Sequence, residues 1–410
     1  MKTIFGRLTL AFLLVCGGLA GCGTTEKTSG GSSQKAEAKN EPAESAQKEE
    51  IASKAESAQK QEAVPQKAAA PVNKPKNVTV KGVYMSGSSA GNHTKFNEMV
   101  NLVDDTELNS IVMDVKDDEG KMTYDSSVPE VNHYGSDHHP KVSDISQRMK
   151  VLKGKDIYSI ARIVTFKDPY MANKKKEFAM KKKDGSLYYN DGIPWVDPYK
   201  EEYWKYVTAV AKDAAKQGFD EIQFDYVRFP DNGEQVDREV KFANPNKKSK
   251  AQNIHDFLLY AKKELKPYGV KVSADVFGVS TSQKDDSGIG QQWESVTPAV
   301  DVISPMTYPS HYGPGVYGIR VPDAKPYELI KKALTPAINR DKVLQEQKKP
   351  VAEIRPWYQD FTATWVDGHI KYGPQQIKDQ IRAGQELGVD EYMLWNPQNK
   401  YTEEAFKKVK

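Results

Sequence analysis

The 410-residue sequence is poor in cysteine, with Cys16 and Cys22 as its two examples. If the first 21 residues are removed on export, Cys22 has no partner for a disulfide, so stability must come from packing. A basic excess is also missing, because 59 basic side chains are nearly balanced by 56 acidic ones. We therefore expect no nucleic-acid partner, since such proteins usually present a strongly basic surface.

Common nucleotide-binding and hydrolase motifs are absent as well. The sequence has no GxSxG nucleophile elbow, no P-loop and no kinase signature, which excludes the common serine hydrolases and nucleotide-dependent enzymes. Its GxGxxG match at residues 313–318 contains Pro314 and does not open a helix, so we reject a dinucleotide site. His138 and His139 lack further ligands at a diagnostic spacing. We therefore expect neither a metal nor another cofactor.

Aromatic residues and leucine are missing from residues 23–76, which consist mainly of Ser, Lys, Glu, Ala, Gln and Pro. All six tryptophans and all 21 tyrosines follow residue 76. Without large apolar side chains, the segment cannot bury enough surface to offset the entropy of ordering. We predict that residues 22–76 form a disordered tether ahead of a globular domain at residues 77–410.

The N-terminus has the pattern of an export signal. Lys2 and Arg7 precede an apolar run at residues 8–20, which is too short to span a bilayer as a stable anchor. The run ends in Leu-Ala-Gly-Cys, which resembles the bacterial lipobox, whose cysteine is acylated. We predict removal of residues 1–21 and attachment of the chain to the extracytoplasmic face of the cell membrane through a lipid on Cys22. The alternative is an ordinary signal peptide followed by an incidental cysteine.

Strand and helix patterns alternate after residue 76. Eight short apolar stretches are separated by longer segments, with amphipathic helices predicted around 204–214, 254–265 and 377–387, which is typical of a parallel sheet. About 330 residues in eight units fit a (β/α)8 TIM barrel. An open doubly wound sheet is the structural alternative, but it usually has a glycine-rich first turn. The predicted strands cover residues 78–85, 110–115, 157–165, 221–226, 271–277, 302–306, 351–357 and 392–395.

The fourth predicted strand carries the most polar residues. Period-two alternation places Glu221, Gln223 and Asp225 on one face. Polar groups inside a barrel are costly unless paired, and the catalytic groups of such barrels project from the C-terminal strand ends. Asp225, nearest that end, is therefore the candidate nucleophile or general base. The alternative is a structural ion pair with Arg162 or Arg228.

A second candidate carboxylate, Asp275, lies near the end of the fifth predicted strand. Neighbouring strand ends put Asp225 and Asp275 within about 5 to 9 Å, the range that glycosidases use for an acid and a nucleophile or base. Two close carboxylates also move their pKa values apart, so that one stays protonated as the acid. We assign that acid to Asp275. The alternative is a cap on the following loop.

Asp114 is a third carboxylate at a predicted strand end. The loop that follows is superficially similar to a calcium loop, but Lys116 occupies a ligand position and Gly120 is misplaced. We expect the acidic residues 117–119 to be solvated.

Aromatic residues recur near the remaining strand ends. Sugars present C–H faces that stack on aromatic rings, so a set of such rings at a barrel mouth favours a saccharide site. The expected substrate contacts are Asp114, Arg162, Trp195, Glu221, Arg228, Tyr308, His311, Trp357 and Trp395.

Six motifs along the globular part are long enough to be specific. They are WVDPY at 195–199, the segments 218–230 and 273–278, SPMTYPSHY at 304–312, RPW at 355–357 and LWN at 394–396. Together they resemble a bacterial family named the putative glycosyl hydrolase domain. The resemblance covers residues 80–405 and implies a TIM barrel related to glycoside hydrolases.

A more distant similarity is to chitinase-type barrels, whose fourth strand ends in Asp-x-x-Asp-x-Asp-x-Glu. Residues 220–225 partly match this motif and residues 306–308 match the Met-x-Tyr motif of the sixth strand, but Val227 replaces the acid glutamate. Substrate-assisted chemistry is therefore not expected, and Asp225 with Asp275 becomes the simpler catalytic pair.

The sequence thus predicts a lipid-anchored glycoside hydrolase that acts on a cell-wall or extracellular polysaccharide. The alternative is a non-catalytic glycan-binding lipoprotein on the same barrel, because the missing glutamate removes the usual acid and the aromatic rim would remain.

Overall fold

The computed structural model describes residues 77–407 of the chain. The predicted signal at residues 1–21, the predicted lipid site Cys22 and the tether at residues 22–76 lie outside the described residues. Between residues 77 and 407, none of the helices combines the length and the apolar composition needed to cross a bilayer.

A parallel sheet forms a closed barrel, which confirms the predicted (β/α)8 fold. Its strand order is β10-β11-β1-β2-β3-β6-β7-β8-β9, and a further pairing between β10 and β8 closes the ring. The strands are β1 (Lys81–Met85), β2 (Ser110–Lys116), β3 (Tyr158–Val164), β6 (Glu221–Asp225), β7 (Lys271–Phe277), β8 (Val302–Met306), β9 (Glu353–Ile354), β10 (Trp357–Gln359) and β11 (Tyr392–Trp395).

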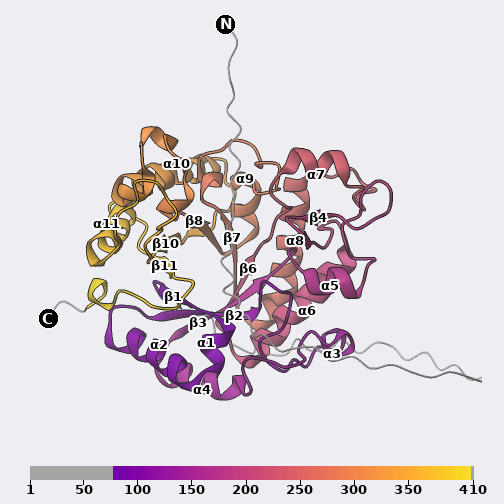
Figure 1. Cartoon of the computed structure of the whole chain (residues 1–410), viewed down its shortest axis with the longest axis horizontal. Helices are drawn as coiled ribbons and strands as arrows, with labels where there is room; N and C mark the ends of the chain where they lie inside the picture. The colour runs from indigo at the N-terminus through magenta and orange to yellow at the C-terminus, as the bar shows by residue number, and fades with distance from the viewer. Residues whose placement is uncertain (1–76, 408–410) are drawn as a thin grey trace, which may run out of the picture. The chain divides into compact units, whose positions relative to one another are not determined.

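Helices surround this ring of strands in Figure 1. They are α1 (Gly87–Gly91), α2 (His93–Asp105), α3 (Pro129–Tyr134), α4 (Ile145–Gly154), α5 (Pro169–Lys174), α6 (Glu201–Gln217), α7 (Gly233–Glu239), α8 (Lys250–Leu265), α9 (Trp293–Val296), α10 (Pro326–Glu346) and α11 (Pro374–Gln385). A small antiparallel hairpin, β4 (Tyr189–Asn190) with β5 (Ile193–Pro194), lies in the long connection between β3 and α6.

The three predicted amphipathic helices are present as α6, α8 and α11. In α6, the buried side chains include Trp204, Val207 and Val210, which form the face that packs on the barrel. The helix ends at Gly218, whose φ of +101° is a left-handed conformation that glycine adopts without steric cost. A Cβ at this position would also lie 2.2 Å from Nζ of Lys153.

The seventh strand differs from its prediction. In place of one strand at residues 351–357, the structure has the short β9 and β10, with Arg355 and Pro356 between them. Proline has no N–H to donate to a sheet ladder, so the hydrogen-bonding pattern is interrupted there. Trp357 then pairs with Met306 of β8 as well as with β11, and this pairing closes the barrel.

A buried ion network lies inside the barrel near the N-terminal ends of the strands. Nη1 of Arg355 donates to both carboxylate oxygens of Glu221, at 2.8 and 3.0 Å, and Nε donates to Glu391 at 2.7 Å. Tyr158 donates its hydroxyl to Glu221 at 3.0 Å. Buried charges are costly unless they are paired, so this network fixes β3 and β6 to the segments around β9 and β11.

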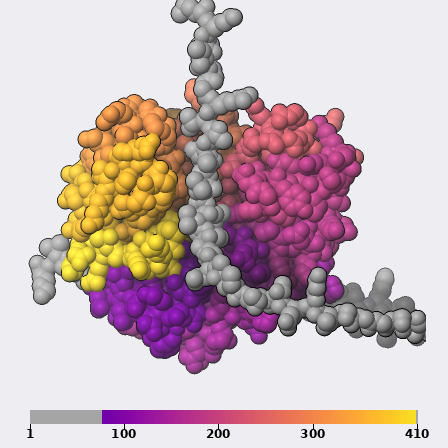
Figure 2. All heavy atoms as spheres, in the orientation of Figure 1, coloured from indigo at the N-terminus to yellow at the C-terminus, as the bar shows by residue number. Residues whose placement is uncertain are grey.

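The first and last strands lie side by side. β1 pairs in parallel with β2 on one edge and with β11 on the other, where Lys81 is opposite Tyr392. Figure 2 accordingly shows the N-terminal elements, in indigo, next to the C-terminal ones, in yellow. The barrel is therefore closed by segments from both ends of the described chain.

Replacing Arg355 by methionine should lower the free energy of unfolding by about 3 to 5 kcal/mol, because Glu221 is left as a buried charge without its partner. Urea denaturation followed by tryptophan fluorescence measures the change. The double variant Arg355→Met with Glu221→Gln should regain part of this loss, since it removes the fully buried one of the two carboxylates that Arg355 pairs with. If the double variant is no more stable than the single one, the pairing does not carry the effect.

Candidate active site

Arg162 is the centre of a polar cluster at the C-terminal ends of the strands. It lies on β3, opposite Asp114 of β2, and next to the end of β6, where Asp225 is located. Nε and Nη2 both donate to Oδ2 of Asp225, at 2.8 and 2.6 Å, and Nη1 donates to Asp114 at 2.8 Å. All three side chains are buried. One cation thus joins two of the predicted site carboxylates.

The loop after β2 adds a third carboxylate, which differs from our expectation. Asp118 accepts hydrogen bonds from Arg162 and Lys167, each at 3.4 Å. Asp117 is buried, accepts two amides of its own loop and forms an ion pair with Lys141 at 2.7 Å. The prediction of a solvated acidic loop is therefore wrong for Asp117, because nearby donors and a cation satisfy its charge.

The backbone turns sharply directly after Asp225. Tyr226 has a φ of +49°, a conformation that costs a residue other than glycine on the order of 1–3 kcal/mol. Its amide donates to Oδ1 of Asp225 at 2.6 Å. Nζ of Lys167 lies over its ring, 4.4 Å from the ring centroid. With Arg162 on Oδ2, both oxygens of Asp225 are held in place.

Asp275 lies beside Asp225. Phe224 of β6 lies opposite Ala274 of β7, and each is followed directly by one of the two aspartates. Asp225 and Asp275 therefore lie on neighbouring strands, whose backbones are about 4.8 Å apart. Nε1 of Trp357 donates to Oδ1 of Asp275 at 2.7 Å, which holds this side chain inside the barrel. Burial and the charge of Asp225 raise the pKa of Asp275 well above its ordinary value, and the indole hydrogen bond offsets this only in part.

Tyr308 and His311 follow β8 at the same end of the barrel. Burial raises the pKa of Tyr308 well above its ordinary value, and the charges of Asp275 and Asp225 add to the effect. The phenol therefore stays protonated near both carboxylates. Burial also lowers the pKa of His311 to about 4, so its imidazole is neutral at pH 7, with Nδ1 3.0 Å from Oγ of Ser310.

Aromatic rings adjoin the carboxylates. Trp395 stacks on Tyr84 with ring centroids 4.1 Å apart, and Trp357 meets Trp395 edge-on at 5.9 Å. Tyr308 lies 6.4 Å from Trp395 and 5.1 Å from His311, again between centroids. Such a set of rings offers the apolar surfaces on which pyranose C–H faces stack.

Tyr84 is a site residue that the sequence analysis missed. Its hydroxyl donates to Oδ2 of Asp114 at 2.7 Å, and its ring supports Trp395. The signal was present, because Tyr84 is the second-last residue of the first predicted strand. An aromatic residue at that position reaches the same end of the barrel as Arg162, whose guanidinium carbon lies 5.8 Å from the Tyr84 ring centroid.

Glu221 is placed away from this cluster. It is the first residue of β6, is fully buried and pairs with Arg355 at the opposite end of the barrel interior from Asp225. The strand alternation correctly assigned it to the inward face, but four residues of strand separate it from the mouth. Its geometry is that of a structural ion pair and not of a substrate contact.

Trp195 and Arg228 form a buried group beside the mouth, in contact with the ring of Tyr226. The guanidinium carbon of Arg228 lies 5.0 Å from the Trp195 ring centroid and 4.5 Å from that of Phe277. Burial lowers the pKa of Arg228. Of the two arginines considered as partners for Asp225, the structure pairs Arg162 with it. Arg228 and Trp195 pack on each other, with exposed fractions of 4% and 2%.

Between residues 77 and 407, no group of three or more His, Cys, Asp and Glu side chains is arranged to hold a metal ion. The positive groups that face the mouth carboxylates are the guanidinium of Arg162 and, at Asp118, the ammonium of Lys167.

Comparison with known proteins identifies a family and a fold. Residues 82–401 match the family described as "Putative glycosyl hydrolase domain". Among curated proteins, no match was found. A hypothetical protein from Ruminiclostridium thermocellum ATCC 27405 is 37% identical, covering 47% of this chain and 97% of its own, with a TM-score of 0.43.

Two further solved structures share the barrel. The PgaB (BpsB) glycoside hydrolase domain from Bordetella bronchiseptica is 12% identical, covering 81% of this chain and 100% of its own, with a TM-score of 0.57. The C-terminal domain of a putative chitinase from Desulfitobacterium hafniense DCB-2 is 11% identical, covering 80% and 97%, with a TM-score of 0.50. At this identity, the likeness shows the fold.

Asp275→Asn should raise the melting temperature at pH 7, by about 2 °C or more. The pKa of Asp275 is raised in the folded protein, so the folded state holds this proton more tightly than the unfolded chain does. Ionisation of Asp275 therefore destabilises the fold as pH rises above the unfolded pKa. The amide is neutral and still accepts the Trp357 hydrogen bond. The gain, measured by differential scanning fluorimetry, should disappear as pH falls towards 4.

Asp225→Asn is the matched comparison, because it removes one ion pair from Arg162 and should lower the melting temperature. A pH-independent effect of Asp275→Asn, or a loss of stability at pH 7, would contradict the raised pKa.

Proposed function

Because the chain belongs to the putative glycosyl hydrolase domain family, we propose that it hydrolyses glycosidic bonds of a polysaccharide, with Asp225 and Asp275 as the catalytic pair. Two neighbouring carboxylates in opposite protonation states are what this reaction needs. The observation that carries the proposal is the different surroundings of the two side chains. Asp225 forms an ion pair with Arg162, whereas Asp275 is buried against an indole N–H and has a raised pKa.

In the proposed reaction, Asp275 is the general acid. Trp357 donates to Oδ1, which leaves Oδ2 to carry the proton. That proton moves to the glycosidic oxygen as the bond to the anomeric carbon breaks, and the electron pair of that bond stays on the oxygen. Asp225 either attacks the anomeric carbon or takes a proton from the attacking water. The anomeric configuration of the first product, observed by NMR, distinguishes these two routes.

Neighbouring groups position the reactants. Arg162 and the Tyr226 amide hold the two oxygens of Asp225, so little reorganisation is needed when a sugar binds. Tyr308 keeps its phenolic proton and is placed to donate a hydrogen bond near both carboxylates. We assign sugar stacking to Trp395, which is partly exposed and rests on Tyr84.

The substrate and the location belong to the same proposal. The Leu-Ala-Gly-Cys sequence supports acylation of Cys22, which would hold the barrel on the extracytoplasmic face of a bacterial membrane. A tether of about 55 residues could then reach a polymer near the membrane, since a flexible chain spans about 5–6 Å times the square root of its length. Cell-wall and extracellular polysaccharides are the polymers within that range.

Asp225→Asn should reduce turnover by about 10³-fold or more, because the residue loses its role as nucleophile or base. The measurement is release of reducing ends from a panel of cell-wall and extracellular polysaccharides. Asp341→Asn is the control, since Asp341 is also a buried carboxyl that accepts a hydrogen bond, but it lies on α10 and away from the mouth. If the wild type binds a glycan and releases no reducing ends from any of them, the chain is a glycan-binding protein and not a hydrolase.

Trp357→Phe should move the alkaline limb of the pH–activity profile to higher pH. The indole hydrogen bond lowers the pKa of Asp275, so its loss raises that pKa and keeps the acid protonated further into the alkaline range. Trp293→Phe is the matched control, because it removes a similar N–H bond to a carboxylate remote from the mouth. An unchanged limb in Trp357→Phe, or an equal shift in the control, would rule out Asp275 as the titrating acid.

A further inference from the structure

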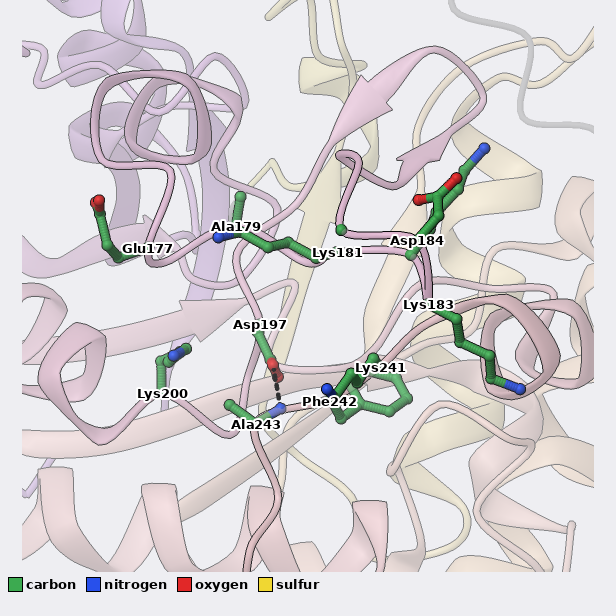
Figure 3. A pocket seen from close by; sticks show the side chains of 12 residues that line it. Glu177, Ala179, Lys181, Lys183, Asp184, Asp197, Lys200, Lys241, Phe242 and Ala243 are labelled. Atoms are coloured by element: carbon green, nitrogen blue, oxygen red, sulfur yellow. Dashed lines mark hydrogen bonds between the residues drawn. The ribbon is translucent and has the colours of Figure 1, made fainter.

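Two adjoining cavities lie on the loops that follow β3 and β6. The first has a volume of about 450 Å³ and is shown in Figure 3, and the second has a volume of about 600 Å³. They share Lys200, Phe242 and Ala243 in their walls. Since the two loops leave the strand ends that carry Arg162 and Asp225, the cavities lie at the same end of the barrel as the candidate active site.

The first cavity is rich in positive charge. Its wall contains five lysines, Lys181, Lys182, Lys183, Lys200 and Lys241, against three acidic residues. Within residues 77–407, none of these lysines forms an ion pair, whereas many others do, among them those at positions 81, 116, 141, 212 and 262. Like charges held close together repel each other, so this arrangement favours an anion in the cavity.

The acidic residues of the wall offset only part of this charge, since there are three of them against five lysines. Asp197 is buried and accepts the amides of Ala243 at 2.7 Å and Tyr199 at 3.0 Å, so it joins the two loops, as the dashed line in Figure 3 shows for Ala243. Asp184 is bound within its own turn by the amide and hydroxyl of Ser186, at 2.9 and 2.6 Å. Glu177 is the third acidic residue of the wall, and it neither joins the two loops nor accepts hydrogen bonds within a turn.

The backbone beneath the lysines is fixed. Lys182 and Val240 form an antiparallel bridge between the two loops. The amide of Lys241 donates to the carbonyl of Lys181 at 2.9 Å, and the amide of Lys183 donates to the carbonyl of Glu239 at 3.0 Å. The lysines therefore project from a backbone that is already ordered, so binding does not have to order this backbone.

The second cavity has a different lining, suited to sugar rings. Tyr199 and Phe242 offer aromatic surfaces and Asn246 offers an amide, while two glutamates and two lysines of the wall balance in charge. Aromatic rings stack on pyranose faces, and amides hydrogen-bond to hydroxyls. A ligand that spans both cavities would therefore combine sugar rings with negative charge.

We infer that these cavities form an accessory groove, here called the lysine groove, which binds an anionic polysaccharide bearing carboxylate or phosphate groups. A membrane surface fits the groove less well, because Lys181, Lys182 and Lys200 are only partly exposed in a concave wall. A polymer chain can enter a concave groove, and a flat bilayer cannot. The inference does not depend on hydrolysis, since binding at the groove is measured whether or not the chain cleaves the polymer.

The test measures binding of the full chain to polygalacturonate and to poly(glycerol phosphate) by isothermal titration calorimetry. The variant Lys181→Gln with Lys241→Gln should bind about tenfold more weakly at low ionic strength. The control Lys342→Gln with Lys378→Gln removes the same charge from exposed positions on α10 and α11 and should bind as the wild type does. Methyl-esterified polygalacturonate, which keeps the backbone without the charge, should bind weakly to all three proteins.

Several results would overturn the lysine groove. These are no binding of either polyanion, equal affinity for the esterified polymer, and equal losses in the groove and control variants. Phosphatidylglycerol vesicles test the membrane alternative. If the groove variant loses vesicle binding and keeps its affinity for both polyanions, the groove is a membrane contact.

Discussion

The guanidinium of Arg162 determines how the mouth of the barrel is built. It forms ion pairs with Asp114, Asp118 and Asp225, which come from β2, the loop after β2 and β6. Without it, these carboxylates would repel one another in a region of low dielectric constant, where such repulsion is strong. The positions of the three strand ends therefore depend on one buried cation.

The same interaction separates the two candidate catalytic residues. Arg162 donates two hydrogen bonds to Asp225, whereas it acts on Asp275 only through its field, and that influence is weaker than burial and the charge of Asp225. Asp225 is thus held in an ion pair, and its charge helps to raise the pKa of Asp275. One cation, placed asymmetrically between two acids, gives them opposite roles.

Arg355 is a second buried arginine in the barrel, and its surroundings are different. Its carboxylate partners, Glu221 and Glu391, are both engaged directly, and a tyrosine hydroxyl completes the group. Each of these two carboxylates pairs directly with the guanidinium, whereas at the mouth Asp275 is bound by an indole N–H and not by Arg162. Both ends of the barrel interior are polar, yet the mouth alone combines paired and unpaired acids with stacked aromatic rings.

Much of this arrangement could be predicted from the sequence. Apolar runs located the strands, with β7, β8 and β11 at the predicted bounds, because buried parallel strands are short and continuous in composition. The interruption at Arg355 and Pro356 was missed, although a proline in a central strand argues against an unbroken ladder. Alternation also placed Asp225 and Glu221 on the inward face.

Depth inside the barrel could not be predicted in the same way. Glu221 and Asp225 have the same orientation on one strand, but their distance from the mouth and their partners depend on how eight strands are staggered. Tyr84, Asp118 and Arg162 come from segments far apart in sequence, so their contacts arise only after the ring has closed. Local patterns identify inward faces, and tertiary geometry assigns their chemistry.

The pairing of β1 with β11 has a consequence for how the chain folds. Lys81 meets a partner roughly 310 residues later, and closing so long a loop costs about 5 kcal/mol of chain entropy before the contact is formed. Until Tyr392 to Trp395 are available, β1 and β10 each present an unpaired strand edge, which is a template for aggregation. A cell that makes this protein must therefore keep a nearly complete barrel from associating until its last strand has joined.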